Sequence, residues 1–190
     1  MPLDYNKKIV FIHIPKNAGT SIEKSFNMSY SGHHNWRFYH DMLKDQWSSY
    51  KKICIFRDPI ERFISCYNYA KMDESFWHSS KGQSLDGKHP DYDICNYFEI
   101  NQLVDLFCNN KINLQHHGWK SQHCWIDGLN ELDIVSMHNI DEFFSKIYGK
   151  NCLKKINVSS KTLETSLRQD SVDLLKKYYK KDYNIWEKIK

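Results

Sequence analysis

A lysine, a glycine and two hydroxyl side chains follow a short apolar run near the start of the chain. The run is Ile9 to Ile14, and the residues after it are Lys16, Gly19, Thr20 and Ser21. Lysine and hydroxyl groups donate hydrogen bonds to anions, and glycine lets the backbone approach a ligand closely. The pattern indicates a site for a phosphate-like group, although an ordinary strand-to-helix turn with a surface lysine fits this stretch alone equally well.

The flanking residues predict the elements that would position these groups. Ile9 to Ile14 is rich in β-branched residues, as in a buried central strand of a parallel sheet, and Pro15 ends it. A helix is expected to begin at Thr20, with Glu23 three residues later as in a capping box. The junction is therefore strand, loop and helix, which leaves backbone N–H groups for an anion. Because Lys16 precedes the glycine, the order differs from the GxxxxGK[ST] loop of nucleoside triphosphatases.

A second junction of the same kind lies at residues 51–70. Ile53 to Phe56 is again an apolar strand pattern, and Pro59 suits the first position of a helix. Arg57 falls at the carboxyl end of this strand, where open α/β sheets bind ligands, and a guanidinium can hold phosphate oxygens bidentately. Ser65 falls on the non-core face of the predicted helix. An arginine before a helix is more often solvated or capping, but two adjacent anion sites would suit a ligand with two separated anionic groups.

These two junctions resemble motifs of the sulfotransferases that use 3′-phosphoadenosine 5′-phosphosulfate (PAPS). The segment FIHIPKNAGTSI is similar to their 5′-phosphosulfate loop and FRDPIERFISCY to their 3′-phosphate element, particularly in the carbohydrate sulfotransferase branch. The resemblance implies that the 5′-phosphosulfate is bound by Lys16, Asn17, Ala18, Gly19, Thr20 and Ser21. It implies that Arg57 and Ser65 bind the 3′-phosphate. It also implies that Ser160 and Lys161, in the segment INVSSK, contribute to a loop that closes over the nucleotide.

The same resemblance implies a fold and an activity. The expected fold is α/β, with a central parallel β-sheet flanked by helices and a P-loop-like nucleotide-binding core, in a single domain over residues 1–190. The expected activity is transfer of a sulfuryl group from PAPS to an acceptor hydroxyl of a carbohydrate, with no metal required. Two alternatives stay open. One is a nonenzymatic nucleotide-binding module. The other is an ATP-dependent phosphotransferase, which should show a GK[ST] order and a Mg²⁺-binding carboxylate near the loop, and the sequence shows neither.

Two adjacent histidines, His33 and His34, are candidates for the general base. An acceptor hydroxyl is a poor nucleophile, and imidazole titrates near neutral pH and can take its proton. Members of the resembling family carry a histidine about this far before the second motif. We favour His34 over His33, although packing or polar surface explains either residue alone equally well. Lys16 would stabilise the charge on the leaving oxygen.

The composition limits the class of protein. A chain of 190 residues with 41% hydrophobic residues can form one domain with a core, and a net charge of +4, spread along the chain, argues against a nucleic-acid partner. The six cysteines form no CxxC pair and His116, His117, His123 and Cys124 lack paired zinc spacing, so we expect reduced thiols and no metal site.

The sequence also carries expectations about location and about its last helix. No leader pattern and no run of about 18 apolar residues occurs, which favours a cytoplasmic protein without a membrane partner. The oligomeric state is left open. The stretch 171–189 predicts one amphipathic helix with Val172, Leu175, Tyr179 and Trp186 facing inward.

Overall fold

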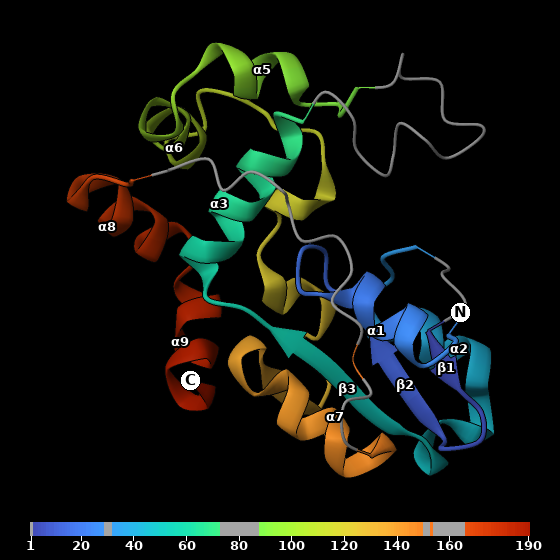
Figure 1. Ribbon diagram of the computed structural model, residues 1–190. Coiled ribbons are helices and arrows are strands. Elements are labelled where there is room, and N and C mark those ends of the chain that lie inside the picture. The colour runs from blue at the N-terminus through green and yellow to red at the C-terminus, as the bar shows by residue number, and fades with distance from the viewer. Residues whose placement is uncertain (1, 29–31, 73–87, 150–152, 154–165) are drawn as a thin grey trace. The chain divides into compact units, whose positions relative to one another are not determined.

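The computed structural model describes residues 2–28, 32–72, 88–149, 153 and 166–190 (Figure 1). Contacts divide the chain into two compact units. Among the described residues the first unit contains 2–58, 120–149, 153 and 181–190, and the second contains 59–72, 88–119 and 166–180. The expectation of a single domain over residues 1–190 stays a prediction.

The first unit is built on a four-stranded sheet. Its strands are β1 (Leu3–Asp4), β2 (Ile9–Ile12), β3 (Lys51–Phe56) and β4 (Asp133–Ser136), and they lie in the order β1-β2-β3-β4. β2, β3 and β4 run parallel, with Phe11 opposite Ile53 and Cys54 opposite Ile134. This confirms the predicted neighbouring parallel strands. β1 is antiparallel to β2 because only a short turn connects the two strands, so the sheet is mostly rather than wholly parallel.

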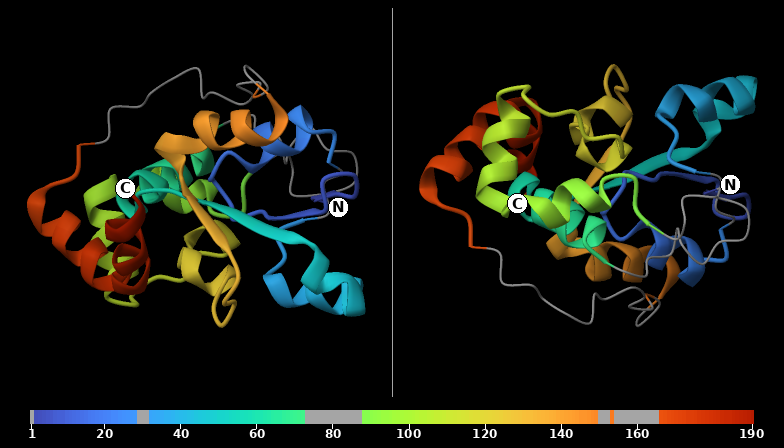
Figure 2. Two further views of the ribbon diagram at one scale, coloured as in Figure 1. Left: turned by 90° about the horizontal axis from the view of Figure 1, so that it is seen from below. Right: turned by 90° about the horizontal axis from the view of Figure 1, so that it is seen from above.

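Helices cover both faces of this sheet. One face packs against α1 (Gly19–Ser25) and α7 (Ile140–Tyr148), and its core includes Phe11, Ile53, Ile22 and Phe144. The other face packs against α2 (Trp36–Leu43) and α9 (Lys180–Ile189), and its core includes Val10, Phe56, Tyr39 and Trp186. The left view of Figure 2 shows α1 in blue and α7 in orange on one side of the strands, with α2 and α9 on the other. The alternation of side chains along β2 and β3 produces these two cores, which confirms the expected α/β class.

Short 3-10 turns complete the first unit. They are η1 (Lys44–Ser49), η3 (Gln122–Trp125) and η4 (Met137–Asn139). η4 connects β4 to α7, and Trp125 at the end of η3 is buried in the same core as Trp186. η3 is the turn that matters for the candidate site.

The second unit is helical. It contains α3 (Pro59–Ala70), α5 (Tyr92–Tyr97), α6 (Ile100–Cys108), η2 (His117–Trp119) and α8 (Gln169–Tyr178). α3 begins at Pro59, as its sequence predicts. The ring of Phe107 in α6 lies 5.9 Å from that of Phe63 and 4.7 Å from that of Tyr178, measured between centroids. The buried Asp91 carboxylate accepts hydrogen bonds from the Trp119 indole and from backbone N–H groups.

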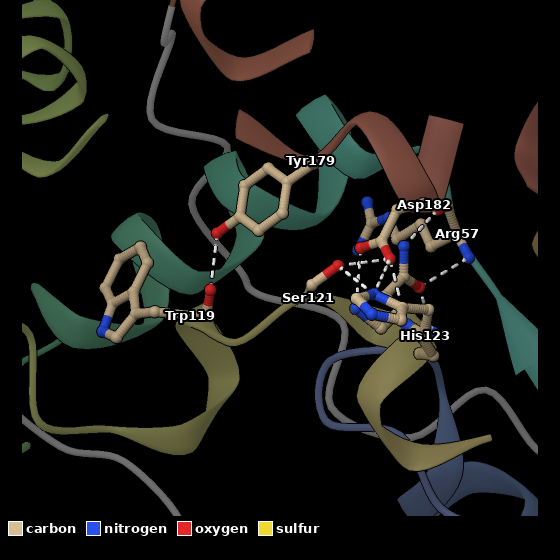
Figure 3. Close-up of polar contacts among 8 residues, drawn as sticks. Arg57, Trp119, Ser121, His123, Tyr179 and Asp182 are labelled. Atoms are coloured by element: carbon tan, nitrogen blue, oxygen red, sulfur yellow. Dashed lines mark hydrogen bonds and ion pairs between the residues drawn. The ribbon is translucent and has the colours of Figure 1, made fainter. Parts of the chain in front are cut away.

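The single helix expected over residues 171–189 is wrong. The structure has two helices, α8 and α9, and Tyr179 lies between them with φ −94° and ψ 30°. The Tyr179 hydroxyl donates to the Trp119 carbonyl at 2.6 Å within the second unit (Figure 3). Leu175, Tyr179 and Trp186 are buried, as expected, whereas Val172 is only half-buried. The apolar spacing was read correctly, but it does not reveal the break between the helices.

The described residues also show the state of five cysteines and whether a membrane-spanning helix or a metal-binding cluster is present among them. Cys54, Cys66 and Cys95 are buried free thiols, and Cys108 and Cys124 are free as well. Within the described ranges, no helix is both long and apolar enough to cross a bilayer. The same part of the chain has no cluster of three or more histidine, cysteine or acidic side chains suited to a metal ion. The cytoplasmic location stays a prediction.

Candidate active site

The loop between β2 and α1 carries Lys16 and has an uncommon backbone. Lys16 has φ 68° and Ala18 has φ 58°, which is the left-handed region that residues with a side chain rarely adopt. Such a conformation costs roughly 1–2 kcal/mol per residue, so the surrounding contacts must hold the loop in place. Lys16 and Ala18 are both half-buried.

Glu23 does not form the predicted capping box. α1 begins at Gly19, one residue earlier than expected, and its N-cap residue Ala18 has no side-chain hydrogen bond. Oε1 of Glu23 lies 2.8 Å from Nδ1 of His13, and each of the two side chains is only 4% exposed. The capping-box prediction is wrong because the Glu23 carboxylate pairs with the buried His13 imidazole, beyond the end of β2, instead of with the backbone of Thr20.

The His13 ring also explains why residue 19 is a glycine. A Cβ atom at this position would lie 2.0 Å from both Cδ2 and Nε2 of His13, far inside van der Waals contact. The first turn of α1 therefore rests on the imidazole ring, which contacts Gly19 and pairs with Glu23 one turn later. This contact places α1 against the end of β2.

Asn17 is committed to the protein through its side chain. Its Nδ2 donates to the Ile55 carbonyl in β3 at 2.7 Å and to Oε1 of Gln122 at 2.6 Å. A carboxamide has two N–H donors, and both are used here, so the backbone N–H is the donor that Asn17 could offer an anion. The backbone N–H of Ser21 is likewise bonded, to the Ala18 carbonyl at 3.0 Å. Ser21 can therefore offer only its hydroxyl group.

Gln122, in η3, connects the two predicted anion-binding elements. Besides accepting from Asn17, its Oε1 accepts the Arg57 N–H at 3.1 Å, and its Nε2 donates to the Arg57 carbonyl at 2.8 Å. The carboxamide is fully buried, with 0% exposed. The bridge that Gln122 forms was not predicted from the sequence, because a single glutamine in a short turn carries no local pattern that identifies its partners. The adjacency of the β2 and β3 ends predicts only that some side chain lies between the loops.

Asp182, in the first turn of α9, fixes η3 in turn. Figure 3 shows its carboxylate together with Ser121 and His123. Oδ2 accepts the Gln122 N–H at 2.6 Å, and Oδ1 accepts the His123 N–H at 2.9 Å and the Ser121 hydroxyl at 2.5 Å. The carboxylate is completely buried. A carboxylate that accepts the first N–H groups of a turn acts as its cap.

The two candidate histidines are held differently. Nδ1 of His33 lies 3.0 Å from the carbonyl oxygen of His13. A carbonyl oxygen can only accept, so Nδ1 of His33 carries the proton, and in the neutral ring Nε2 has the lone pair. His34 instead stacks on Phe38, with ring centroids 3.8 Å apart and planes inclined by 13°. Both histidines are half-buried.

The other predicted site residues are placed as follows. Thr20 is half-buried in the first turn of α1, and Arg57 is half-buried directly after β3. Ser65 is half-buried on α3 and belongs to the second unit, so its predicted pairing with Arg57 stays a prediction. Ser160 and Lys161 lie outside the described residues. Within the first unit, the structure brings together the Lys16 loop, Arg57 and, through His13, His33.

A family model described as the sulfotransferase family matches residues 3–188. The chain belongs to the sulfotransferase family. No curated protein and no solved structure matches it. The match covers both junctions and extends across nearly the whole chain, and it supports sulfuryl transfer as the general activity of this sulfotransferase.

Proposed function

We propose that this sulfotransferase moves a sulfuryl group from PAPS to a hydroxyl group of a carbohydrate acceptor. The observation that supports the donor most directly is the Gln122 carboxamide, which bonds to Asn17 in one loop and to Arg57 in the next. The two loops follow neighbouring parallel strands and so lie at the same edge of the sheet. PAPS carries a 5′-phosphosulfate and a separate 3′-phosphate, which suits two adjacent anion-binding elements.

Each element takes one anionic group of the donor in this proposal. The Lys16 ammonium and the hydroxyls of Thr20 and Ser21 bind the 5′-phosphosulfate, and Arg57, with Ser65, binds the 3′-phosphate. Ser160 and Lys161, which lie outside the described residues, are assigned to the nucleotide from the sequence resemblance alone. Because α1 has only seven residues, we assign most of the attraction at the 5′ end to the charge of Lys16 and to the N–H groups of its loop rather than to a helix dipole.

The transfer step needs alignment, charge stabilisation and a base. The acceptor oxygen forms a bond to sulfur while the bond from sulfur to the bridging oxygen breaks, and adenosine 3′,5′-bisphosphate leaves. Lys16 stabilises the negative charge that develops on the leaving oxygen. The acceptor proton passes to Nε2 of His33. We choose His33 over His34 because its hydrogen bond to the His13 carbonyl gives the tautomer that a base requires, whereas His34 is stacked on Phe38.

Nucleotide binding is tested first, by isothermal titration of PAPS, adenosine 3′,5′-bisphosphate and ATP with and without Mg²⁺. We expect PAPS and the bisphosphate to bind without Mg²⁺ and more tightly than ATP. Lys16→Ala should weaken PAPS binding by about tenfold, whereas Lys24→Ala, at an exposed position of α1, should not change it. Binding of ATP alone, dependent on Mg²⁺, would favour the phosphotransferase alternative.

Transfer is tested by incubating labelled PAPS with sugars, phenols and small alcohols. Once an acceptor is found, His33→Ala should lower turnover by about 10²-fold or more without changing affinity for the bisphosphate. His34→Ala should retain most turnover. If His34→Ala loses turnover and His33→Ala does not, His34 is the general base. A protein that binds PAPS but sulfates no acceptor in the screen would be better explained as a nucleotide-binding module.

A further inference from the structure

The His33 ring is held by His13 through two separate contacts. Nδ1 of His33 donates to the His13 carbonyl at 3.0 Å, which fixes the position of the proton. The His33 ring also packs against the His13 ring, with centroids 4.2 Å apart and planes inclined by 75°. The first contact uses the backbone of His13 and the second uses its side chain. The orientation of His33 therefore depends on where the His13 ring lies.

The His13 ring is itself fixed by α1. Its Nδ1 lies 2.8 Å from the Glu23 carboxylate, and because an ionised carboxylate only accepts hydrogen bonds, Nδ1 carries the proton. Its Cδ2 and Nε2 edge packs so closely on Gly19 that a Cβ atom would not fit there. Both members of the pair are buried. Together these contacts hold the imidazole in one rotamer.

We propose that Glu23 and His13 are positioning residues for His33. Glu23 fixes the His13 imidazole against Gly19, and the fixed imidazole holds the His33 ring with Nδ1 directed at the His13 carbonyl, which gives the orientation and tautomer of a general base. Neither residue of the pair touches the reacting atoms in this arrangement. The inference rests on the proposed role of His33 in sulfuryl transfer and goes beyond it, since it says how that role is prepared before any substrate binds.

A buried polar pair at this place calls for such an explanation. Burying polar side chains away from water is costly. Replacing a buried polar pair with apolar residues of similar size often gives equal or greater stability. Phe11 and Ile22, close to the pair in the sequence, belong to an apolar core cluster and show the alternative way of filling the interior. A pair that orients a base has a use that apolar packing lacks, because a small misplacement of a reacting group can cost about 10²-fold in rate.

The first test reads the tautomer of His33 in the ligand-free protein by ¹⁵N–¹H NMR of histidine-labelled samples. We expect the wild-type ring to show a protonated Nδ1. Glu23→Gln should keep this signature, because its carbonyl oxygen can still accept from His13. Glu23→Leu removes the acceptor and should give His33 a mixture of tautomers. An unchanged His33 signature in folded Glu23→Leu protein would overturn the proposal.

The second test separates positioning from nucleotide binding. Glu23→Leu should lower the turnover number with labelled PAPS by about tenfold or more, while the dissociation constant of adenosine 3′,5′-bisphosphate changes by less than about threefold. Glu23→Gln should restore turnover. Equal losses of turnover and affinity would show that the pair supports the Lys16 loop instead, and unchanged turnover would also overturn the proposal. Lys24→Ala is the matched control on the exposed side of α1.

If Glu23→Leu does not fold, the double variant Glu23→Leu, His13→Phe replaces it, because removing both buried polar partners avoids leaving one unpaired. The same two outcomes are expected, and an unchanged His33 signature would again contradict the inference. The NMR measurement needs neither donor nor acceptor. Absence of sulfuryl transfer would therefore count against the proposed function, whereas an unchanged His33 ring would count against the positioning pair.

Discussion

Gln122 bonds to both backbone groups of Arg57, donating from Nε2 to the carbonyl at 2.8 Å and accepting the N–H on Oε1 at 3.1 Å. This paired geometry resembles one step of a strand ladder, made by a side chain where β3 has ended. It holds the Arg57 backbone while leaving the guanidinium uninvolved in these two bonds. The structure thus fixes the position of Arg57 without using the group proposed to bind phosphate.

Replacing Gln122 with alanine should lower the free energy of unfolding by about 2–4 kcal/mol, because it removes a fully buried carboxamide and its hydrogen bonds to Asn17 and to the Arg57 backbone. Urea unfolding measures the loss. Gln115→Ala, which changes an exposed glutamine, should shift stability by less than about 0.5 kcal/mol. Equal stability of the Gln122 and Gln115 variants would contradict the bridge between the two loops.

Arg57→Ala should weaken binding of adenosine 3′,5′-bisphosphate by several-fold or more, while binding of adenosine 5′-phosphosulfate, which lacks the 3′-phosphate, should hardly change. The backbone bonds to Gln122 survive this substitution, so the fold around the loop should persist. Calorimetric titration of both nucleotides with both proteins gives the comparison. If the two nucleotides lose affinity equally, Arg57 only supports the fold.

Gly19→Ala should disturb both stability and nucleotide binding, since the new Cβ would lie 2.0 Å from two atoms of the His13 ring. We expect a loss of about 1–3 kcal/mol in unfolding free energy, measured by urea unfolding, with weaker PAPS binding. Gly118→Ala makes a similar clash, 2.7 Å from Nδ1 of His116 in the second unit, and is the matched control. It should lower stability without changing the affinity of the folded protein for PAPS. Comparable affinity losses in both variants would argue against a local effect at the loop.

The buried Cys95 thiol should make the protein less stable in alkali. Burial, with a smaller contribution from Asp91, raises the pKa of Cys95 from 9.0 to about 12. Between these values the unfolded thiol loses its proton and the folded thiol keeps it, so stability falls with rising pH by about 1.4 kcal/mol per pH unit. In urea unfolding between about pH 9.5 and about pH 10.5, the stability advantage of wild type over Cys95→Ala should shrink by about 1 kcal/mol. Parallel pH profiles would mean that Cys95 is not buried in solution.

The sequence was sufficient for the elements whose signals are local. The apolar runs at Ile9 to Ile14 and Ile53 to Phe56 predicted β2 and β3, and Pro59 marked the start of α3. Buried strands and helix starts depend on short stretches, so patterns of a few residues identify them. The order of these elements was also enough to predict parallel pairing of β2 and β3.

The contacts that support the site depend on residues far apart in the chain, and the sequence did not reveal them. Glu23 matched a capping box by spacing, but its partner is His13, ten residues earlier. The bond between Asn17 and Gln122 spans 105 residues, and that between Gln122 and Asp182 spans 60. No local propensity encodes such pairs. For the same reason, the choice between His33 and His34 needed the His13 carbonyl, which only the fold brings near.

Because the Asp182 carboxylate caps the turn that joins the two loops, the candidate site cannot be completed before Asp182 has been synthesised. During synthesis the Lys16 loop, Arg57 and Gln122 all leave the ribosome before Asp182 does, and a domain generally folds as a unit. Until α9 arrives, the N–H groups of Gln122 and His123 have no carboxylate to bind, and the turn that joins the two loops lacks its cap. The nascent chain can therefore complete the candidate site only after residue 182 has been translated.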